Sequence, residues 1–156
     1  MTDTMIPQGV PAERSLTMFR EAYFRSQLRY WWTKLTWRCS CLQDLDEMLE
    51  HRPLEGSRYE GIKAVRIDRI RGTQGRSDEF DDKFHPTQER SRARWMGVAM
   101  EKLRGRDLPA VELIQVDDMY FVRDGHHRIS VSRAMGQDFI DAEITVMRLR
   151  GTSFNR

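Results

Sequence analysis

The amino-acid sequence predicts an α+β (α/β) domain with a small mixed sheet, preceded by an N-terminal helical arm. The 156-residue chain has room for one ordinary domain. Its hydrophobic content of 39% is too high for a disordered chain, although 32% of its residues are charged. The hydrophobic pattern is helical before Pro53 and alternates between short strands and short helices after Tyr59. We therefore expect an arm at 1–56, a domain at 57–150 and a tail at 151–156.

Residues 12–38 are expected to form one long amphipathic, basic helix. Pro11 suits its first turn, where a missing N–H costs no hydrogen bond. Large apolar residues recur at steps of four, three and four, and we call them the apolar stripe: Phe24, Leu28, Trp31 and Leu35. Between residues 12 and 42 there are six basic residues and two acidic ones. The arm therefore combines aromatic rings with positive charge.

Three uses of the tryptophans Trp31, Trp32 and Trp37 remain open at this stage. We favour packing, either against the sheet or against a second copy of the chain. The two alternatives use the neighbouring arginines as well: binding of single-stranded nucleic acid, or attachment to an anionic membrane surface. A ring-rich helix on so small a domain favours a homodimer, and the oligomeric state stays open.

A second, short helix is expected after the arm. Ser40 and Gln43 have the spacing of a capping box, and leucines share one face at Leu42, Leu45 and Leu49. Pro53 and Gly56 end it.

The remaining elements follow in order from residue 62. Residues 62–67 are expected to form a strand and residues 71–86 a loop. A helix then begins at a Thr87 cap and ends at Gly105.

The last part of the chain is expected to contain a hairpin, a helix and a strand. Residues 111–116 and 119–123 form the hairpin. A helix at 127–135, closed by Gly136, precedes a strand at 140–146 with alternating apolar positions.

Arginine dominates the positive charge. The 26 Lys and Arg residues face 24 Asp and Glu, so the net charge is only +2 and does not indicate a histone-like binder. Only four of the 26 are lysines. We favour codon bias from a G·C-rich genome as the cause, and the alternative is a preference for phosphate or carboxylate ligands.

The two cysteines, Cys39 and Cys41, are expected to be ordinary intracellular thiols. They lie too close together for an unstrained disulfide, and two cysteines alone do not make a four-ligand zinc site. No signal peptide or membrane span is visible, so a cytoplasmic location is expected.

The most informative segment is the strand-to-helix turn Asp124-Gly125-His126-His127-Arg128. A glycine there lets the backbone approach a ligand, and the first N–H groups of the helix carry partial positive charge. Such a turn suits a phosphate group. One alternative is a plain turn with solvated histidines.

A metal site is the other alternative at this turn. It would use His126 and His127 with His85 or Asp124. Adjacent histidines diverge on a helix, so we expect no metal site.

The order of these elements resembles the ParB/sulfiredoxin superfamily. That family has a Gln-x-Arg element after its first strand and a Gly-x-x-Arg turn before a helix and a last strand. Here the first element is Gln74-Gly-Arg76, after Ile67-Asp-Arg-Ile70, and the second is Gly125-His-His-Arg128. The likeness covers about residues 60–148.

The resemblance implies a nucleotide-binding fold. In ParB proteins the two boxes hold the triphosphate of CTP, and in sulfiredoxin the turn holds ATP phosphates beside a catalytic cysteine. In free-serine kinases of this superfamily the site transfers a phosphoryl group. Carried over, it implies a nucleoside triphosphate, CTP or ATP, with Mg²⁺. The implied phosphate contacts are Gln74, Arg76, Gly125, His127 and Arg128.

Two departures change what the resemblance implies about catalysis. His126 stands where sulfiredoxin has its cysteine, and His126 and His127 replace a glutamate and an arginine of ParB's second box. For phosphotransfer or nucleotide hydrolysis, Asp124 is the candidate Mg²⁺ ligand or base, and the two histidines are candidate bases or electrophiles. Whether the protein is an enzyme is left open. The alternative function is a non-catalytic DNA- or protein-binding adaptor that acts through the N-terminal helix.

Overall fold

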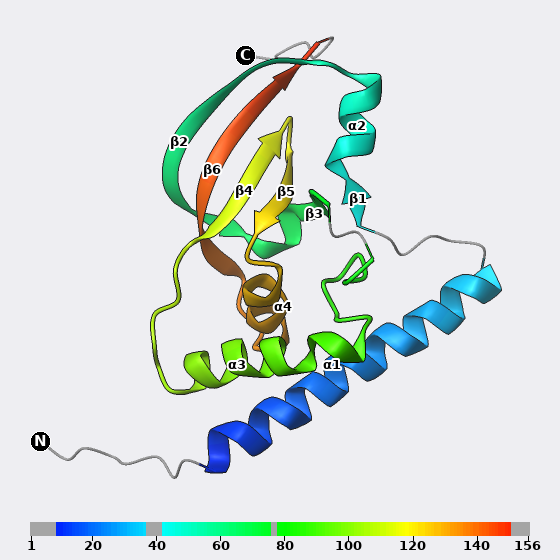
Figure 1. Ribbon diagram of the computed structural model, residues 1–156, viewed down its shortest axis with the longest axis vertical. Coiled ribbons are helices and arrows are strands. Elements are labelled where there is room, and N and C mark those ends of the chain that lie inside the picture. The colour runs from blue at the N-terminus through cyan, green and yellow to red at the C-terminus, as the bar shows by residue number, and fades with distance from the viewer. Residues whose placement is uncertain (1–8, 37–41, 76–77, 151–156) are drawn as a thin grey trace, which may run out of the picture.

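The computed structural model describes residues 9–36, 42–75 and 78–150. Its described part contains one six-stranded mixed sheet with helices on both faces (Figure 1). The helices are α1 (Gly9–Thr36), α2 (Leu45–His51), α3 (Arg92–Leu103) and α4 (His126–Ala134), with short 3-10 turns η1 (Ile67–Arg69) and η2 (Glu89–Ser91). The strands are β1 (Gln43–Asp44), β2 (Leu54–Arg66), β3 (Ile70–Thr73), β4 (Val111–Val116), β5 (Met119–Asp124) and β6 (Phe139–Leu149). The predicted class, a mixed sheet with a preceding helix, is confirmed.

The sheet is built around the predicted hairpin. Strands β4 and β5 pair antiparallel through a turn in which Asp117 has a φ of 53°. Strand β3 joins β5 in parallel and β6 joins β4 in parallel, which gives the order β1-β3-β5-β4-β6-β2. Because β3 and β5 are parallel, their carboxyl ends meet at one edge of the sheet. The turn that begins α4 lies at that edge.

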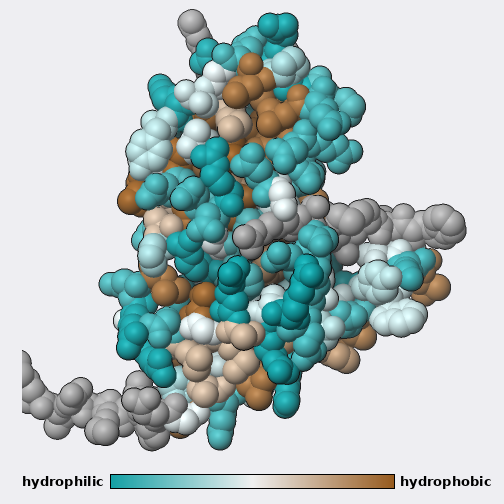
Figure 2. All heavy atoms as spheres, viewed as in Figure 1, coloured by the Kyte–Doolittle hydropathy of each residue, from teal (hydrophilic) through white to brown (hydrophobic). Residues whose placement is uncertain are grey.

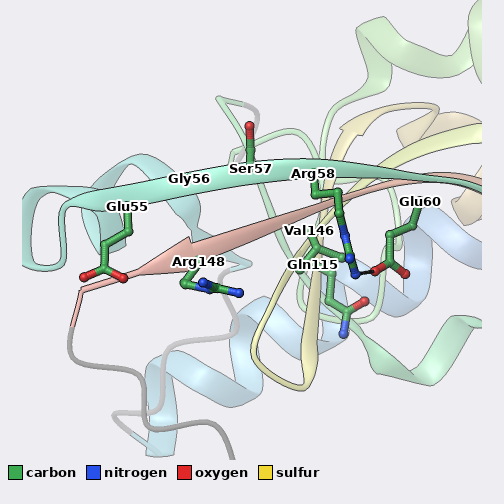
Figure 3. Close-up of a pocket in the computed structure, with 8 residues that line it drawn as sticks. All are labelled: Glu55, Gly56, Ser57, Arg58, Glu60, Gln115, Val146 and Arg148. Atoms are coloured by element: carbon green, nitrogen blue, oxygen red, sulfur yellow. Dashed lines mark hydrogen bonds and ion pairs between the residues drawn. The ribbon is translucent and has the colours of Figure 1, made fainter.

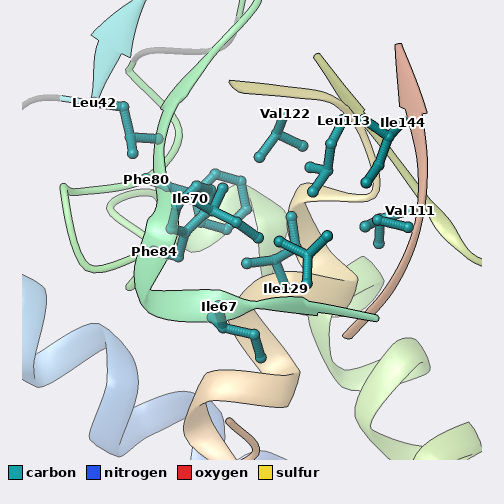
Figure 4. Packing of buried hydrophobic residues seen from close by; sticks show 12 residues of the cluster. Leu42, Ile67, Ile70, Phe80, Phe84, Val111, Leu113, Val122, Ile129 and Ile144 are labelled. Atoms are coloured by element: carbon teal, nitrogen blue, oxygen red, sulfur yellow. The ribbon is translucent and has the colours of Figure 1, made fainter. Parts of the chain in front are cut away.

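Both faces of the central strands are buried. On one face Ile129 of α4 packs with Leu113, Val122 and the neighbouring core residues shown in Figure 4. On the other face Leu45 of α2 packs with Ile114. Strands that are covered on both sides carry nearly continuous apolar runs, as β4 does.

Helices α4, α3 and α1 follow one another below the sheet (Figure 1). A second core cluster joins all three, with Trp95 of α3 at 0% exposure between Phe19 of α1 and Val131 of α4. The Phe19 and Trp95 rings meet edge to face with centroids 5.7 Å apart. The indole Nε1 of Trp95 donates a 2.8 Å hydrogen bond to Ser130 Oγ.

The arm helix is confirmed, but the face expected to pack is wrong. The buried residues of helix α1 lie between its first turn and Ser26, namely Pro11, Ser15, Phe19, Ala22 and Ser26. The apolar stripe is exposed instead, from 53% at Leu28 to 76% at Leu35. The reason is length: α1 has 28 residues and its partner α3 has 12, so the outer half of α1 extends beyond the helix it packs on.

Several predicted boundaries are corrected. The strand expected at 62–67 is β2, which begins at Leu54, so the boundary expected after residue 56 falls within a strand. The expected loop 71–86 begins with β3. Thr87 does not cap α3, which begins at Arg92 after η2.

The short second helix begins later than expected. Its cap is Asp44, whose carboxylate accepts a hydrogen bond from the N–H of Asp46. Ser40, Trp37, Cys39 and Cys41 lie outside the described residues.

Candidate functional site

The turn between β5 and α4 depends on a glycine. Gly125 has a φ of +97°, in the left-handed region, and a Cβ there would lie 2.5 Å from Val111 Cγ1. Its carbonyl oxygen accepts the hydrogen bond of the Ile129 N–H, which is the first bond of α4. The N–H groups of the three preceding residues therefore stand at the positive end of the helix.

The end of β3 lies directly beside this turn. Thr73 pairs with Val122, and Thr73 Oγ1 and His126 Nε2 are hydrogen-bonded at 2.6 Å. The N–H of Gln74 donates to the carbonyl oxygen of Val122 at 2.9 Å, and Arg123 Nε reaches Gln74 Oε1 at 3.5 Å. The structure thus brings Gln74 next to the Gly125 turn. Arg76 lies outside the described residues.

Both histidines of the turn are buried. His126 is 2% exposed and His127 is 7% exposed, so the alternative of solvated histidines is wrong. The Phe80 ring covers them: it stacks on His126 with centroids 6.0 Å apart and meets His127 edge-on at 5.2 Å. The loop that contains Phe80 therefore lies over the start of α4.

Arg128 is engaged by the protein itself. Its Nη1 donates to the carbonyl oxygens of Pro109 and Ala110, at 2.6 and 2.7 Å. Its Nη2 donates to Asp124 Oδ2 at 2.6 Å. Arg128, a predicted phosphate contact, and Asp124, a predicted Mg²⁺ ligand, therefore form an ion pair with each other in this conformation. A ligand that uses either side chain must open that pair.

A buried carboxylate network, which the sequence patterns did not reveal, lies next to the histidines. Asp81 is 4% exposed, although it lies in the segment 71–86 that was expected to be a loop. Its carboxylate accepts hydrogen bonds from the N–H groups of Lys83 and His85 and from His85 Nδ1. Burial acts to raise the pKa of Asp81, but the hydrogen bonds and charge of His85 outweigh it and lower that pKa below its ordinary value.

Helix α1 is tied to the same loop. Arg29 Nε lies 3.3 Å from Asp81 Oδ2, and Arg29 Nη2 lies 2.5 Å from Asp82 Oδ1. Ser26 Oγ donates a buried 2.8 Å hydrogen bond to the carbonyl oxygen of Pro86. In the sequence, the two acids lie between Phe80 and Phe84, and this pair of large apolar residues is the signal that could have indicated a packed loop.

No cluster of three His, Cys, Asp or Glu side chains that could hold a metal ion occurs within residues 9–36, 42–75 and 78–150. The pair His126 and His127 is therefore not joined by His85 or Asp124 in a shared site. Mg²⁺ prefers carboxylate and phosphate oxygens, and Asp124, with a side chain 62% exposed, is the carboxylate at the turn.

Two pockets differ in whether a predicted site residue lines them. One, of about 390 Å³, lies between the α3–β4 connection and α4, and Arg128 lines it together with Lys102 and Arg106. The other, of about 580 Å³, lies along β2, β4 and β6, where Arg58 is paired with Glu60 (Figure 3). None of the predicted site residues lines this second pocket.

The tryptophans of the arm do not pack on the chain's own core. Trp31 and Trp32 are each 68% exposed, which contradicts packing across the sheet. Figure 2 shows apolar side chains at the outer end of α1, at the right of the view. Within the described part of the chain, no helix is both long enough and apolar enough to cross a membrane.

Comparison with known proteins gives one structural likeness. No protein-family model matches the chain, and no curated protein sequence matches it. The structure is similar to that of sulfiredoxin from Arabidopsis thaliana, at 17% sequence identity and a TM-score of 0.41. The likeness covers 55% of this chain and 84% of the sulfiredoxin chain.

Proposed function

We propose that the edge where β3 and β5 end and α4 begins binds the phosphate groups of a nucleoside triphosphate, CTP or ATP, with Mg²⁺. One observation carries the proposal: the 2.6 Å contact between Thr73 and His126 brings Gln74 beside the Gly125 turn. The side-chain amide of Gln74, the first N–H groups of α4 and the guanidinium of Arg128 then lie at one sheet edge. These are donors suited to a phosphate chain.

The backbone supplies the first part of this interaction. Gly125, in the left-handed conformation, begins α4, so the first N–H groups of the helix are those of His126, His127 and Arg128. These groups carry the positive end of the α4 dipole, which favours an anion there. The Gln74 side chain, held by Arg123, adds a donor from the facing strand.

The side chains at the turn act once the pair Asp124–Arg128 opens. Arg128 is then able to place its planar fork on phosphate oxygens, and Asp124 is able to bind Mg²⁺. The ring of Phe80 covers the histidines, so a nucleotide that reaches them displaces the loop 78–86.

Calorimetric titration of the full chain with CTP, ATP and ADP in the presence of Mg²⁺ tests the proposal. The wild type is expected to bind one of them, and Gln74→Ala and Arg128→Ala are each expected to weaken binding about tenfold or more. Arg58→Ala, which removes an exposed arginine on β2 away from the turn, serves as the matched control. Absence of binding, or equal binding by all three variants, would overturn the proposal.

Turnover is measured on the same samples. Release of inorganic phosphate without an added acceptor identifies a hydrolase, and phosphate release only with an acceptor identifies a phosphotransferase. His127→Ala is then expected to lower the rate more than the affinity if the imidazole moves a proton. Binding without turnover identifies a nucleotide-binding module.

A second candidate function rests on the exposed outer half of α1, which presents Trp31 and Trp32 beside basic side chains. Such a surface suits a DNA- or protein-binding adaptor, with single-stranded DNA stacked on the rings. Fluorescence titration with oligonucleotides should show binding that weakens with salt and is lost in Trp31→Ala and Trp32→Ala. Tyr59→Ala, an aromatic side chain 60% exposed on β2, is the control. Unchanged affinity in the tryptophan variants contradicts this candidate.

A further inference from the structure

A basic pocket lies at the opposite end of α4 from the Gly125 turn. It has a volume of about 290 Å³, is open to solvent and is lined by α1, the loop 78–86 and the last turn of α4. Three different elements each contribute a cation to its wall: Arg25, Lys83 and Arg133. Met18 and Ala22 of α1 form an apolar part of the lining. None of the residues assigned to the proposed nucleotide edge lines this pocket.

The cations of this pocket outnumber its carboxylates, because Glu21 of α1 is the one acidic side chain in the lining. Among the ion pairs of the described residues, none within 4.0 Å involves Arg25, Lys83 or Arg133. The acids nearest in the loop, Asp81 and Asp82, are already engaged by His85 and Arg29. The lining therefore carries three basic side chains against the single carboxylate of Glu21 and keeps an excess of positive charge.

Arg133 is held in a setting that favours an anion beside it. Its Nη1 is buried without a hydrogen-bond acceptor, and its guanidinium lies 5.9 Å from the centre of the Phe84 ring. Burial, with the charge of Arg71 next, lowers the pKa of Arg133, against the smaller opposing effects of Asp68, Asp81 and Asp82. An anion in the pocket would stabilise the charged guanidinium.

The turn that presents Lys83 is strained and pre-organised. Phe84 has a φ of 59°, which is unfavourable for a bulky side chain, and it is 1% exposed. Because Phe84 points into the core, its two neighbours Lys83 and His85 face the pocket. Both of their N–H groups donate to Asp81 Oδ1, which fixes the turn. Strained backbone of this kind is typical of ligand sites.

We propose that this pocket binds the phosphate group of a small phosphomonoester. A tetrahedral dianion accepts hydrogen bonds from donors that approach from several directions, as the three cations here do, whereas a planar carboxylate is matched by one arginine fork. The pocket has room beyond the phosphate, and the apolar wall at Met18 and Ala22 suits a short organic group. His85 adds an imidazole to the same wall.

The test is a ¹⁵N NMR titration of the full chain with inorganic phosphate and with glycerol 3-phosphate, each against sodium chloride at matched ionic strength. Saturable shifts are expected at the amides of Lys83, His85 and Ala134. Arg25→Gln and Lys83→Gln should each weaken binding about tenfold, since each removes a charged donor. Both side chains are exposed, so these variants keep the fold. Tighter binding of glycerol 3-phosphate identifies a phosphomonoester site, and binding of phosphate alone restricts the site to free phosphate and overturns the phosphomonoester assignment.

The control variant is Arg20→Gln, which removes an exposed arginine from another face of α1 and should leave the affinity unchanged. Three results would overturn the proposal: shifts confined to Gly125–Arg128, shifts reproduced by chloride, or equal weakening by Arg20→Gln. Loss of nucleotide binding at the Gly125 turn would leave this result unaffected, so the two proposals fail separately.

Discussion

The hydroxyl of Thr73, at the end of β3, is hydrogen-bonded at 2.6 Å to the buried Nε2 of His126, at the start of α4. The two residues come from segments that are 53 positions apart. Their contact brings Gln74, which follows Thr73, beside the Gly125 turn. A buried polar pair of this kind stabilises the junction only while both partners are present.

Thr73→Val keeps the side-chain shape and removes the hydroxyl. We expect the free energy of unfolding to fall by about 1–3 kcal/mol, because the imidazole of His126 loses a buried partner. Thr17→Val on the exposed face of α1 removes a hydroxyl bonded only within its helix and should change it by less than about 0.5 kcal/mol. Urea denaturation monitored by circular dichroism measures both. Equal effects would contradict a buried pair at Thr73.

Gly125→Ala should destabilise the protein more than Gly136→Ala. Both glycines have a positive φ, +97° and +73°, so each substitution introduces left-handed strain of about 1–2 kcal/mol. A Cβ at Gly125 also lies 2.5 Å from Val111 Cγ1, whereas nothing lies within 4 Å of one at Gly136. Thermal unfolding of the two variants gives the comparison, and a lower midpoint for Gly136→Ala would show that the turn is not tightly packed.

Asp81 should make the stability of the protein depend on acid. Its pKa is lower in the folded chain than in the unfolded chain, so the unfolded chain binds the extra proton. The stabilisation is complete above about pH 4, the ordinary value for aspartate, and is lost as the pH falls through the folded pKa. Asp81→Asn should therefore be less stable than the wild type at pH 7, with a difference that shrinks below about pH 4. A difference that grows on acidification would have the wrong sign.

Phe19 and Trp31, on the same helix, should differ widely in their effect on stability. Phe19 is 1% exposed and packs on Trp95, so Phe19→Ala should cost about 3–5 kcal/mol. Trp31 is 68% exposed, so Trp31→Ala should cost less than about 0.5 kcal/mol. Urea denaturation of both variants, at protein concentrations too low for self-association, measures the two losses of stability separately. A large loss in Trp31→Ala under those conditions would mean that the stripe packs within the chain.

Regular elements with strong patterns could be predicted from the sequence. The hairpin at 111–116 and 119–123 was correct because both strands are apolar and an Asp-Asp pair separates them. Strand β3 was missed because Gly72 interrupts a short apolar run. That glycine is required by a long-range contact, since a Cβ there would lie 2.3 Å from a ring carbon of Phe121. Local periodicity does not contain this information.

The apolar stripe shows another limit of periodicity. The spacing of its residues identifies a face of α1 but says nothing about the length of the helix it meets, and α3 covers only the first half. Within the site, the resemblance implied that Gln74 and Gly125 both contact phosphate, and the pairing of β3 with β5 brings them to the same sheet edge. The burial of Asp81 depends on Arg29 and on the covering phenylalanines, which lie in irregular or distant segments.

Helix α1 has a mechanical consequence for the loop that covers the histidines. At a rise of 1.5 Å per residue its 28 residues span about 42 Å, as one continuous rod. The helix packs on α3 through Phe19, and it contacts the loop through the Ser26 hydrogen bond and the Arg29 ion pair. A displacement of its outer end at Leu35 would therefore be transmitted along the helix to Ser26 and Arg29. Through their contacts it would reach the loop that contains Phe80 without involving the sheet.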